Sequence, residues 1–282
     1  MRGMRGPRPV VTIAVTLFLG LAAAPAQGRA KDESSEWSKT FTISGNPELR
    51  VDTNDASVLV ESWDRNSIEA HVTSRGYRLA IQSSEGEGGV RVEEHQTGDR
   101  VELNVHVPTV HWSIGINYRS VRVELKVPRR GNYEIRTRDG NIEAHDVRGD
   151  LRFTSGDGHI EAEGLDGVLH ARSGDGHMRI RGRFDELSLE TGDGSIEARC
   201  DSGSKISGLW SLHTGDGHVN LGLPADFAAN LDAHTGDGHV TVDFPVTISG
   251  SVSRSEVRGK MNGGGQELRI RTGDGSIHIE KL

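Results

Sequence analysis

The chain has 282 residues, of which 34% are hydrophobic, and a formal net charge of −8 at pH 7. This acidic balance argues against the phosphate backbone of a nucleic acid as a partner. The single cysteine, Cys200, excludes an intrachain disulfide, so stability has to come from stacked aliphatic side chains and backbone hydrogen bonds.

The first segment, 1–26, has the pattern of a secretory signal peptide. Three arginines precede an apolar run at 10–24, and a small-residue cleavage site follows at 24–26. The run is short for a membrane span, which needs roughly 20 apolar residues, and no other stretch approaches that length. Cleavage would remove the three arginines and change the formal net charge from −8 by −3, to about −11. We expect a mature protein outside the cytoplasm, periplasmic or secreted, without a membrane span.

A polar leader, 27–37, is followed by one predicted domain, 38–282, whose repeats become regular from about residue 131. An early, degenerate copy of the repeat consists of Leu49, Val51, Thr53, Asp55, Val58 and Val60. Alternating runs at 78–82, 89–93, 100–107 and 120–127 predict strands, some of them paired as hairpins. The segment from His111 to Tyr118 alternates aromatic and aliphatic residues, which fits either a buried strand or a projecting contact strand.

One short phrase recurs seven times in the second half of the chain: a hydroxyl residue, glycine or its substitute, aspartate, glycine, a polar residue and an aliphatic residue. Its turn aspartates are Asp139, Asp157, Asp175, Asp193, Asp216, Asp237 and Asp274. These positions are separated by 18, 18, 18, 23, 21 and 37 residues. A fixed period predicts a stack of like units.

Each unit is predicted to be a strand, a tight turn and a second strand. Apolar residues recur six and four positions before each aspartate and three and five after it, with mostly polar residues between them. Glycine is expected at the corner because of its backbone freedom. Aspartate and the preceding hydroxyl residue are expected there because they can bond the turn amides. Gly149 and Gly167 mark a second corner, where Asp185 stands in the third unit.

Two arrangements fit such units: antiparallel hairpins in a sandwich, or a β-helix whose coils lie on top of one another. Because the same residue type recurs at each offset, we favour an all-β solenoid, a β-helix with about 18 residues per coil. Insertions at 201–209, at 223–229 and between Phe244 and Gly265 interrupt the rhythm. The last of these is expected to contain one irregular coil, and the insertions are expected to supply the non-repeated surface.

Several segments resemble a known family. They are SVRVELKVP at 120–128, the repeated TGDG phrase, and the ending GKMNGGGQELRIRTGDGSIHI at 259–279. Together they resemble the bacterial putative-adhesin domain family, which is related to the head-GIN adhesins, over roughly residues 38–282. The resemblance implies a β-helix in a protein of largely unknown function, and it brings no catalytic residues with it.

Stacked coils would place Asp157, Asp175 and Asp193 in one file, with coils about 4.8 Å apart. Two such charges repel by roughly 1 kcal/mol in water. A second file, two residues further along each unit, contains His159 and His177. The aspartates are explained by turn chemistry alone or, alternatively, by a divalent metal site for calcium or zinc that includes the two histidines.

An enzyme is not expected. No pattern of paired cysteine and histidine surrounds Cys200. A polysaccharide lyase or hydrolase would need two carboxylates in distinct environments, whereas the repeated aspartates occupy equivalent corners.

We predict a non-enzymatic scaffold, an adhesin or cell-envelope binding protein, whose partner is an envelope protein or a surface polysaccharide. The alternatives are a divalent-metal-binding repeat protein and a polysaccharide-cleaving enzyme, and self-association through exposed strand edges stays open.

Overall fold

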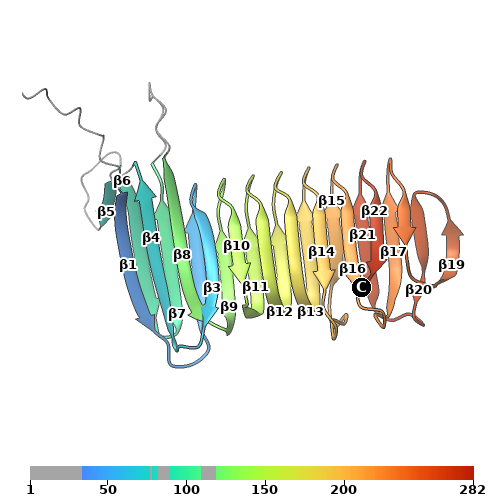
Figure 1. The fold of residues 1–282 in the computed structure, drawn as a ribbon, viewed down its shortest axis with the longest axis horizontal. Coiled ribbons are helices and arrows are strands. Elements are labelled where there is room, and N and C mark those ends of the chain that lie inside the picture. The colour runs from blue at the N-terminus through green and yellow to red at the C-terminus, as the bar shows by residue number, and fades with distance from the viewer. Residues whose placement is uncertain (1–33, 77, 82–88, 109–118) are drawn as a thin grey trace, which may run out of the picture. The chain divides into compact units, whose positions relative to one another are not determined.

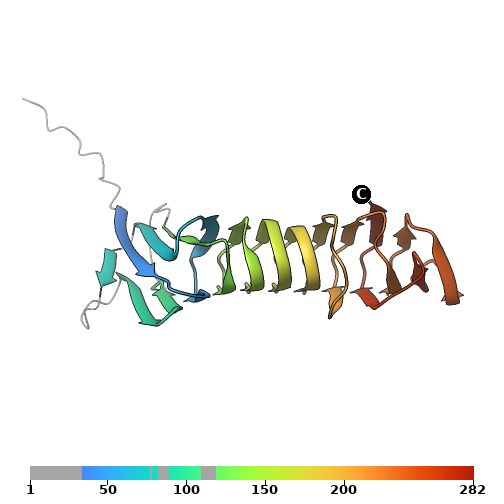
Figure 2. The ribbon, with the colours of Figure 1, turned by 90° about the horizontal axis from the view of Figure 1, so that it is seen from below.

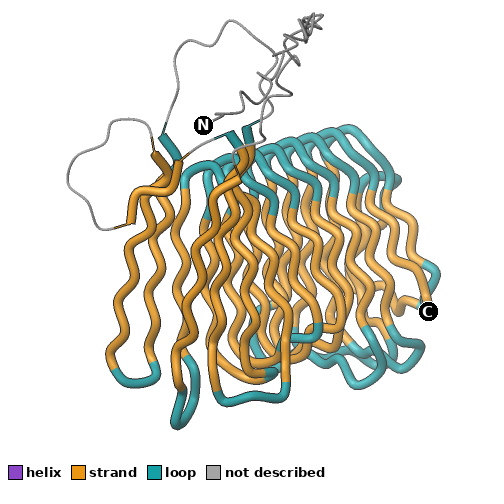
Figure 3. The backbone as a smooth tube through the Cα atoms, turned by 60° about the vertical axis from the view of Figure 1, so that its left-hand side comes forward, coloured by secondary structure: helices purple, strands orange, loops and turns teal. Residues whose placement is uncertain are grey.

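The computed structural model describes residues 34–76, 78–81, 89–108 and 119–282. The predicted signal peptide and the segment from His111 to Tyr118 lie outside these described residues. Strands and their connections make up the described part of the chain, which contains no helix (Figure 3). Accordingly, nothing in the described ranges is a helix of the length and apolarity that a membrane crossing requires. The prediction of an all-β, solenoid-like fold is confirmed.

The unit Asp32–Leu282 is built from two walls of parallel strands that meet at the aspartate corners (Figures 1 and 2). Wall A holds the strands that run toward these corners, and wall B holds the strands that leave them. In stacking order, wall A consists of β7 (Arg100–His106), β2 (Glu48–Thr53), β9 (Arg130–Arg136), β11 (Arg148–Thr154), the second parts of β12 (Ile160–Arg172) and β13 (Met178–Thr191), β15 (Trp210–Thr214), β21 (Glu267–Thr272) and β17 (Ala229–Thr235).

Wall B follows the same order of coils. It consists of β8 (Ser120–Pro128), β3 (Ser57–Trp63), β10 (Ile142–His145), the first parts of β12 and β13, β14 (Ile196–Cys200), β16 (Val219–Leu223), β22 (Ile277–Lys281) and β18 (Val240–Val242). The degenerate early copy of the repeat, in β2 and β3, therefore forms a genuine coil within the stack.

Equivalent residues of successive coils are direct neighbours. On wall A, Leu151 pairs with Tyr133 on one side and with Leu169 on the other. On wall B, Ile160 lies between Ile142 and Met178 in the same way. All of these side chains are buried between the walls. The alternation predicted from the sequence thus fills the space between the walls with inward rows of aliphatic and aromatic side chains.

Antiparallel strands close both ends of the stack. At one end, β6 (Gly89–Thr97) pairs antiparallel with β7 and parallel with the short strand β5 (Arg78–Ile81), while β4 (Ser67–Arg75) pairs antiparallel with β8 and with β1 (Ser34–Thr42). At the other end, β20 (Glu256–Met261) pairs with β17 and with β19 (Val246–Val252). Such strands cover edges that would otherwise be free to pair with another chain.

The irregular coil predicted between Phe244 and Gly265 does not exist. These residues form the β19–β20 hairpin, because the segment has no glycine-aspartate-glycine corner and folds back on itself. Residues 267–281, the last coil in the sequence, are also not last in the stack. They lie between the coil of β15 and β16 and the coil of β17 and β18.

A ladder of buried hydroxyl groups joins the coils at the aspartate corner. Ser155 Oγ accepts the N–H of Gly158 in its own turn (3.0 Å) and donates to the carbonyl of Gly140 in the preceding coil (3.0 Å). Ser173 repeats both bonds one coil further on. The predicted use of these hydroxyls in their own turn is confirmed. Each one also bonds a neighbouring coil, so a single side chain stabilises the turn and the stacking together.

The corner glycines are required by the stacking and not, as predicted, by their backbone angles. The described glycines with positive φ lie elsewhere. A Cβ at Gly158 would lie 2.0 Å from the carbonyl oxygen of Gly140, and a Cβ at Gly176 would lie 2.0 Å from that of Gly158. Only glycine leaves room for the carbonyl of the coil before it.

At the second corner the conformational argument does hold. Gly149 has φ 116° and Gly167 has φ 127°, angles that side chains rarely tolerate. In the third unit, Phe184 and not the expected Asp185 pairs with Gly167, and Asp185 lies in the register shift that follows. There it receives two hydrogen bonds from the guanidinium of Arg183, at 2.9 and 2.8 Å. Those bonds hold the pKa of the Asp185 carboxyl below its usual value.

We predict that Gly158→Ala destabilises the protein by about 3 kcal/mol, the upper end of the usual cost of overpacking, because the two nearest atoms belong to the backbone carbonyl of Gly140, which cannot turn aside. Thermal and urea unfolding followed by circular dichroism would measure the effect. Gly208→Ala is the matched control, because the nearest atoms to its Cβ belong to the end of the Glu186 side chain. Equal stability of the two variants would contradict the role assigned to close stacking.

Candidate functional site

The seven turn aspartates occupy successive corners of the stack. Backbone bonds connect them: the N–H of Asp175 donates to Gly156 O and that of Asp193 donates to Gly174 O, both at 3.3 Å. Asp274 comes between Asp216 and Asp237, because its coil is inserted there. The carboxylates are exposed, and within the described part of the chain no ion pair or side-chain hydrogen bond neutralises them.

The prediction that these aspartates bond their own turn amides is wrong. The hydroxyl residue two positions earlier accepts the turn N–H instead, as Ser155 does from Gly158. The carboxylates are therefore free to point into solvent. The charges of neighbouring corners also interact. The pKa of Asp55 is raised first by burial and then by the negative charge of Asp139 in the next coil of the stack.

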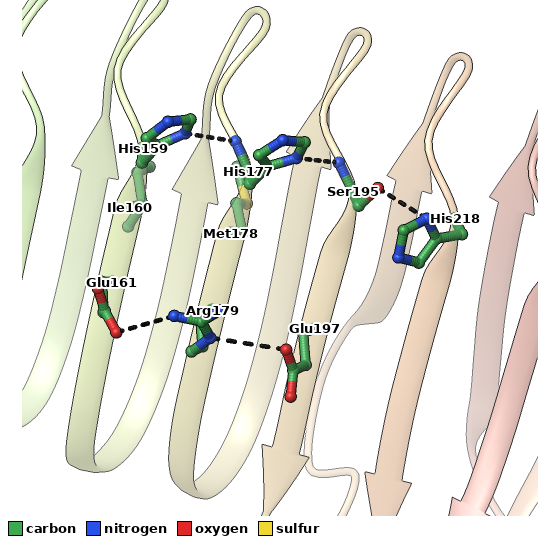
Figure 4. Close-up of a pocket in the computed structure, with 9 residues that line it drawn as sticks. All are labelled: His159, Ile160, Glu161, His177, Met178, Arg179, Ser195, Glu197 and His218. Carbon is green, nitrogen blue, oxygen red and sulfur yellow. Dashed lines mark hydrogen bonds and ion pairs between the residues drawn. The ribbon is translucent and has the colours of Figure 1, made fainter.

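The residues two positions after the aspartates form a second ladder, along the start of wall B (Figure 4). His159 Nδ1 accepts the backbone N–H of His177 (3.0 Å), and His177 Nδ1 accepts that of Ser195 (2.9 Å). The rings of His159 and His177 are stacked, with centroids 5.3 Å apart and planes 7° apart. Ser195 Oγ lies 2.9 Å from Nδ1 of His218 and continues the row.

This bonding assigns the protons of the two imidazoles. A ring nitrogen that accepts a hydrogen bond carries no proton, so the proton of neutral His159 and His177 is on Nε2. Both side chains are exposed. The row therefore presents an Nε2–H donor from each of two successive coils, along a line that crosses the strands.

A second polar row lies two residues further down wall B. Arg179 Nη1 lies 3.2 Å from Glu161 Oε1, and Arg179 Nε lies 3.5 Å from Glu197 Oε2. In the sequence, the glutamates indicate only an acidic face that an arginine interrupts. The structure instead pairs the three charges across three coils, and the exposed ion pairs contribute little stability but fix the side chains in a row.

A groove of about 350 Å³ runs between these two rows (Figure 4). It is lined by His159, Ile160, Glu161, His177, Met178, Arg179, Ser195, Glu197 and His218. The side chains of Ile160 and Met178 are buried, so the polar rows form the sides of the groove. Imidazole donors on one side and carboxylates on the other provide complementary hydrogen-bonding groups for a polyhydroxylated ligand.

Metal binding by Asp157, Asp175, Asp193, His159 and His177 stays a prediction. Within the described residues, no group of three or more histidine, cysteine, aspartate or glutamate side chains is placed to hold a metal ion. A metal on Nε2 of either histidine would also need the ring proton on Nδ1. That proton would face the N–H of the next coil and break the ladder.

Cys200 is fully buried at the end of β14, and burial, followed by the charge of Asp201, raises the pKa of its thiol. The thiolate that nucleophilic chemistry requires is therefore disfavoured. No acid and base pair stands out among the turn aspartates either, since all seven lie in equivalent, exposed corners.

The predicted insertions meet around a second groove, of about 550 Å³. Its lining comes from 203–206, 226–228 and 264–266. Phe227, one of the lining residues, packs its ring against that of Trp210, with centroids 5.0 Å apart. The sequence marks each insertion by its interrupted period, but only the coil order brings the third insertion beside the other two.

Comparisons with known proteins give a family and several similar structures. The family model described as Toastrack DUF4097 matches residues 45–280. A putative cell adhesion protein from Clostridium sporogenes is 15% identical, with a TM-score of 0.42, over 89% of this chain and 100% of that one. A putative lipid binding protein from Parabacteroides distasonis is 15% identical, with a TM-score of 0.41, over 88% and 98%. A putative adhesin from Bacteroides fragilis is 8% identical, with a TM-score of 0.39, over 87% and 97%. No curated protein matches the chain.

We predict that Asp175→Asn stabilises the protein, raising the midpoint of thermal unfolding by roughly 2 °C at low salt. Asparagine keeps the shape of the turn residue and removes a charge that lies between those of Asp157 and Asp193. The gain should shrink in 1 M salt, where screening acts over about 3 Å. Asp226→Asn, in an exposed loop outside the row, is the control. A loss of stability on Asp175→Asn at both salt concentrations would show that the carboxylate has a favourable partner.

Proposed function

The chain belongs to the Toastrack DUF4097 family, and we propose that it is a non-enzymatic scaffold outside the cytoplasm that binds an extended surface polysaccharide along wall B. The observation that carries the proposal is the groove between the histidine row and the Glu161–Arg179–Glu197 row. Its polar groups recur once per coil, so the surface is itself a repeating array.

The direction of the array selects the shape of the ligand. The donors of His159 and His177 follow one another along the stack, with ring centroids 5.3 Å apart. An extended peptide pairs with a strand edge and would run along the strands. A chain that crosses the strands and presents hydroxyl groups at a regular interval matches the array better, and an extended glycan chain has this property.

Charge selects the class of polysaccharide. The turn aspartates lie two residues from the histidines and are exposed without cationic partners in the described residues. Their field repels polyanions such as uronic acid polymers. The Nε2–H groups of the imidazoles donate hydrogen bonds, and Glu161 and Glu197 accept them, so a neutral, hydroxyl-rich glycan gains contacts on both sides of the groove.

The location and the lack of catalysis rest on sequence features together with this site. The segment 1–26 has the pattern of a signal peptide, and a surface glycan is accessible only to a protein outside the cytoplasm. The groove offers paired, exposed charges and a regular donor row, whereas glycan cleavage needs one carboxyl group with a raised pKa beside a second carboxylate. An adhesin role follows from holding such a polymer.

We predict that His159→Ala with His177→Ala weakens binding of a neutral envelope glycan about tenfold or more, since two donors worth about 1 kcal/mol each are lost. Purified glycans, neutral and uronic acid-containing, would be titrated into the full chain by calorimetry, with reducing ends assayed in parallel. The control is His213→Ala with His234→Ala, two exposed histidines on wall A.

The control should bind like the unmodified protein. Equal binding by both double variants would place the ligand elsewhere, and absence of binding to every glycan would remove the proposal. Release of reducing ends would identify an enzyme instead.

A further inference from the structure

The coil at 267–281 fills a space between two coils that precede it in the sequence. On wall A, Leu268 pairs with Trp210 on one side and with Leu231 on the other. On wall B, Ile277 pairs with Val219 and Val240 in the same way. We call this space the slot: it lies between the coil of β15 and β16 and the coil of β17 and β18.

The corner ladders pass through the inserted coil. Thr272 Oγ1 donates to Gly217 O (2.7 Å) on one side of the slot. On the other side, Thr235 Oγ1 donates to Gly275 O (2.6 Å). Without residues 267–281, both flanking coils would expose unpaired strand edges and unsatisfied corner carbonyls, which proteins rarely leave open. A segment can therefore fill the slot only if it has the strand–corner–strand pattern of the repeat.

A single connection, 262–266, joins the inserted coil to the preceding strand β20. It has to pass around the end of β17, because β20 pairs with one edge of β17 and β21 with the other. The turn uses three successive left-handed residues, Asn262 (φ 47°), Gly263 (φ 89°) and Gly264 (φ 85°). Asparagine is one of the few non-glycine residues that are enriched in this conformation, and the two glycines can equally adopt an extended one.

We propose that the slot accepts residues 267–281 from a second copy of this chain, giving a domain-swapped dimer in which each copy completes the stack of the other. Every contact in the slot would be retained, and only 262–266 would change, from a turn to an extended hinge. Exchange of identical elements through a hinge is a low-cost route to a closed, symmetric dimer. This inference is independent of the proposed glycan site.

A disulfide test detects the exchange directly. Ser211 and Arg269 are partners across the slot, at the strand spacing that a disulfide can bridge. Two single variants, Ser211→Cys and Arg269→Cys, each in a Cys200→Ala background, would be mixed, unfolded, refolded together at high concentration and oxidised. The expected result is a disulfide-linked heterodimer on a non-reducing gel, several-fold above the level in either variant refolded alone.

The control pair is Ser188→Cys and Ser211→Cys, which are partners between β13 and β15, outside the slot. Mixed in the same way, this pair should give no heterodimer above background, because neither residue lies on the exchanged segment. Equal cross-linking by the two mixtures, or none by either, would overturn the proposal.

A hinge variant gives an independent measurement. Deletion of Gly263 to Gly265 leaves too little chain to pass around β17 within one copy, so the protein should elute as a dimer with twice the monomer mass by light scattering. A folded monomer, recognised by an unchanged circular dichroism spectrum, would contradict the proposal. If the deletion prevents folding, the cysteine mixtures, which keep the native hinge, decide the question.

Discussion

The structure depends on the close approach of consecutive coils at the aspartate corner. There, the carbonyl of one coil lies where the Cβ of the next would be, as the 2.0 Å separation at Gly158 shows, and a buried hydroxyl bonds both coils. These two features fix the register, because a shift by one residue would put a side chain against a carbonyl and turn the inward rows outward. The aliphatic core, the pairing of the walls and the outward rows all follow from this register.

Register also gives the outer surface its order. Because equivalent residues are neighbours, a residue type that recurs in the repeat becomes a row in space, as His159 and His177 do. Unlike residues at equivalent positions, such as Glu161 and Arg179, come into contact in the same way. The rows are then bound to one another, through an imidazole that accepts the next backbone N–H or through an ion pair. These bonds hold the polar side chains on both sides of the groove in place, which lowers the cost of ordering them for the glycan that we propose.

Much of this could be predicted from the sequence. Fixed offsets of apolar residues predicted the walls, and the recurring aspartates predicted their file, since periodicity reports local register directly. The sequence does not show why the corner glycines are required, because the crowding at Gly158 comes from Gly140, a contact that exists only after stacking. The pairing of Glu161, Arg179 and Glu197 cannot be predicted from the sequence for the same reason, since it joins three coils. The aspartate carboxylate and the nearby hydroxyl can both accept the turn N–H groups. The hydroxyl accepts them in the structure, and the sequence does not decide between these two acceptors.

The order of the coils in the stack cannot be predicted from the repeat pattern. Trp210, Leu231 and Leu268 hold the same position in their units, and their strands are mutually compatible neighbours. A repeat pattern states what a coil can stack against and leaves open which coil it will meet. The choice is made by connections such as 224–228, which spans the slot, and 262–266, which turns around β17. The regularity that makes the fold readable thus also makes its coils interchangeable, and only the hinge geometry assigns the coil at 267–281 to the slot of its own chain rather than to that of a second copy.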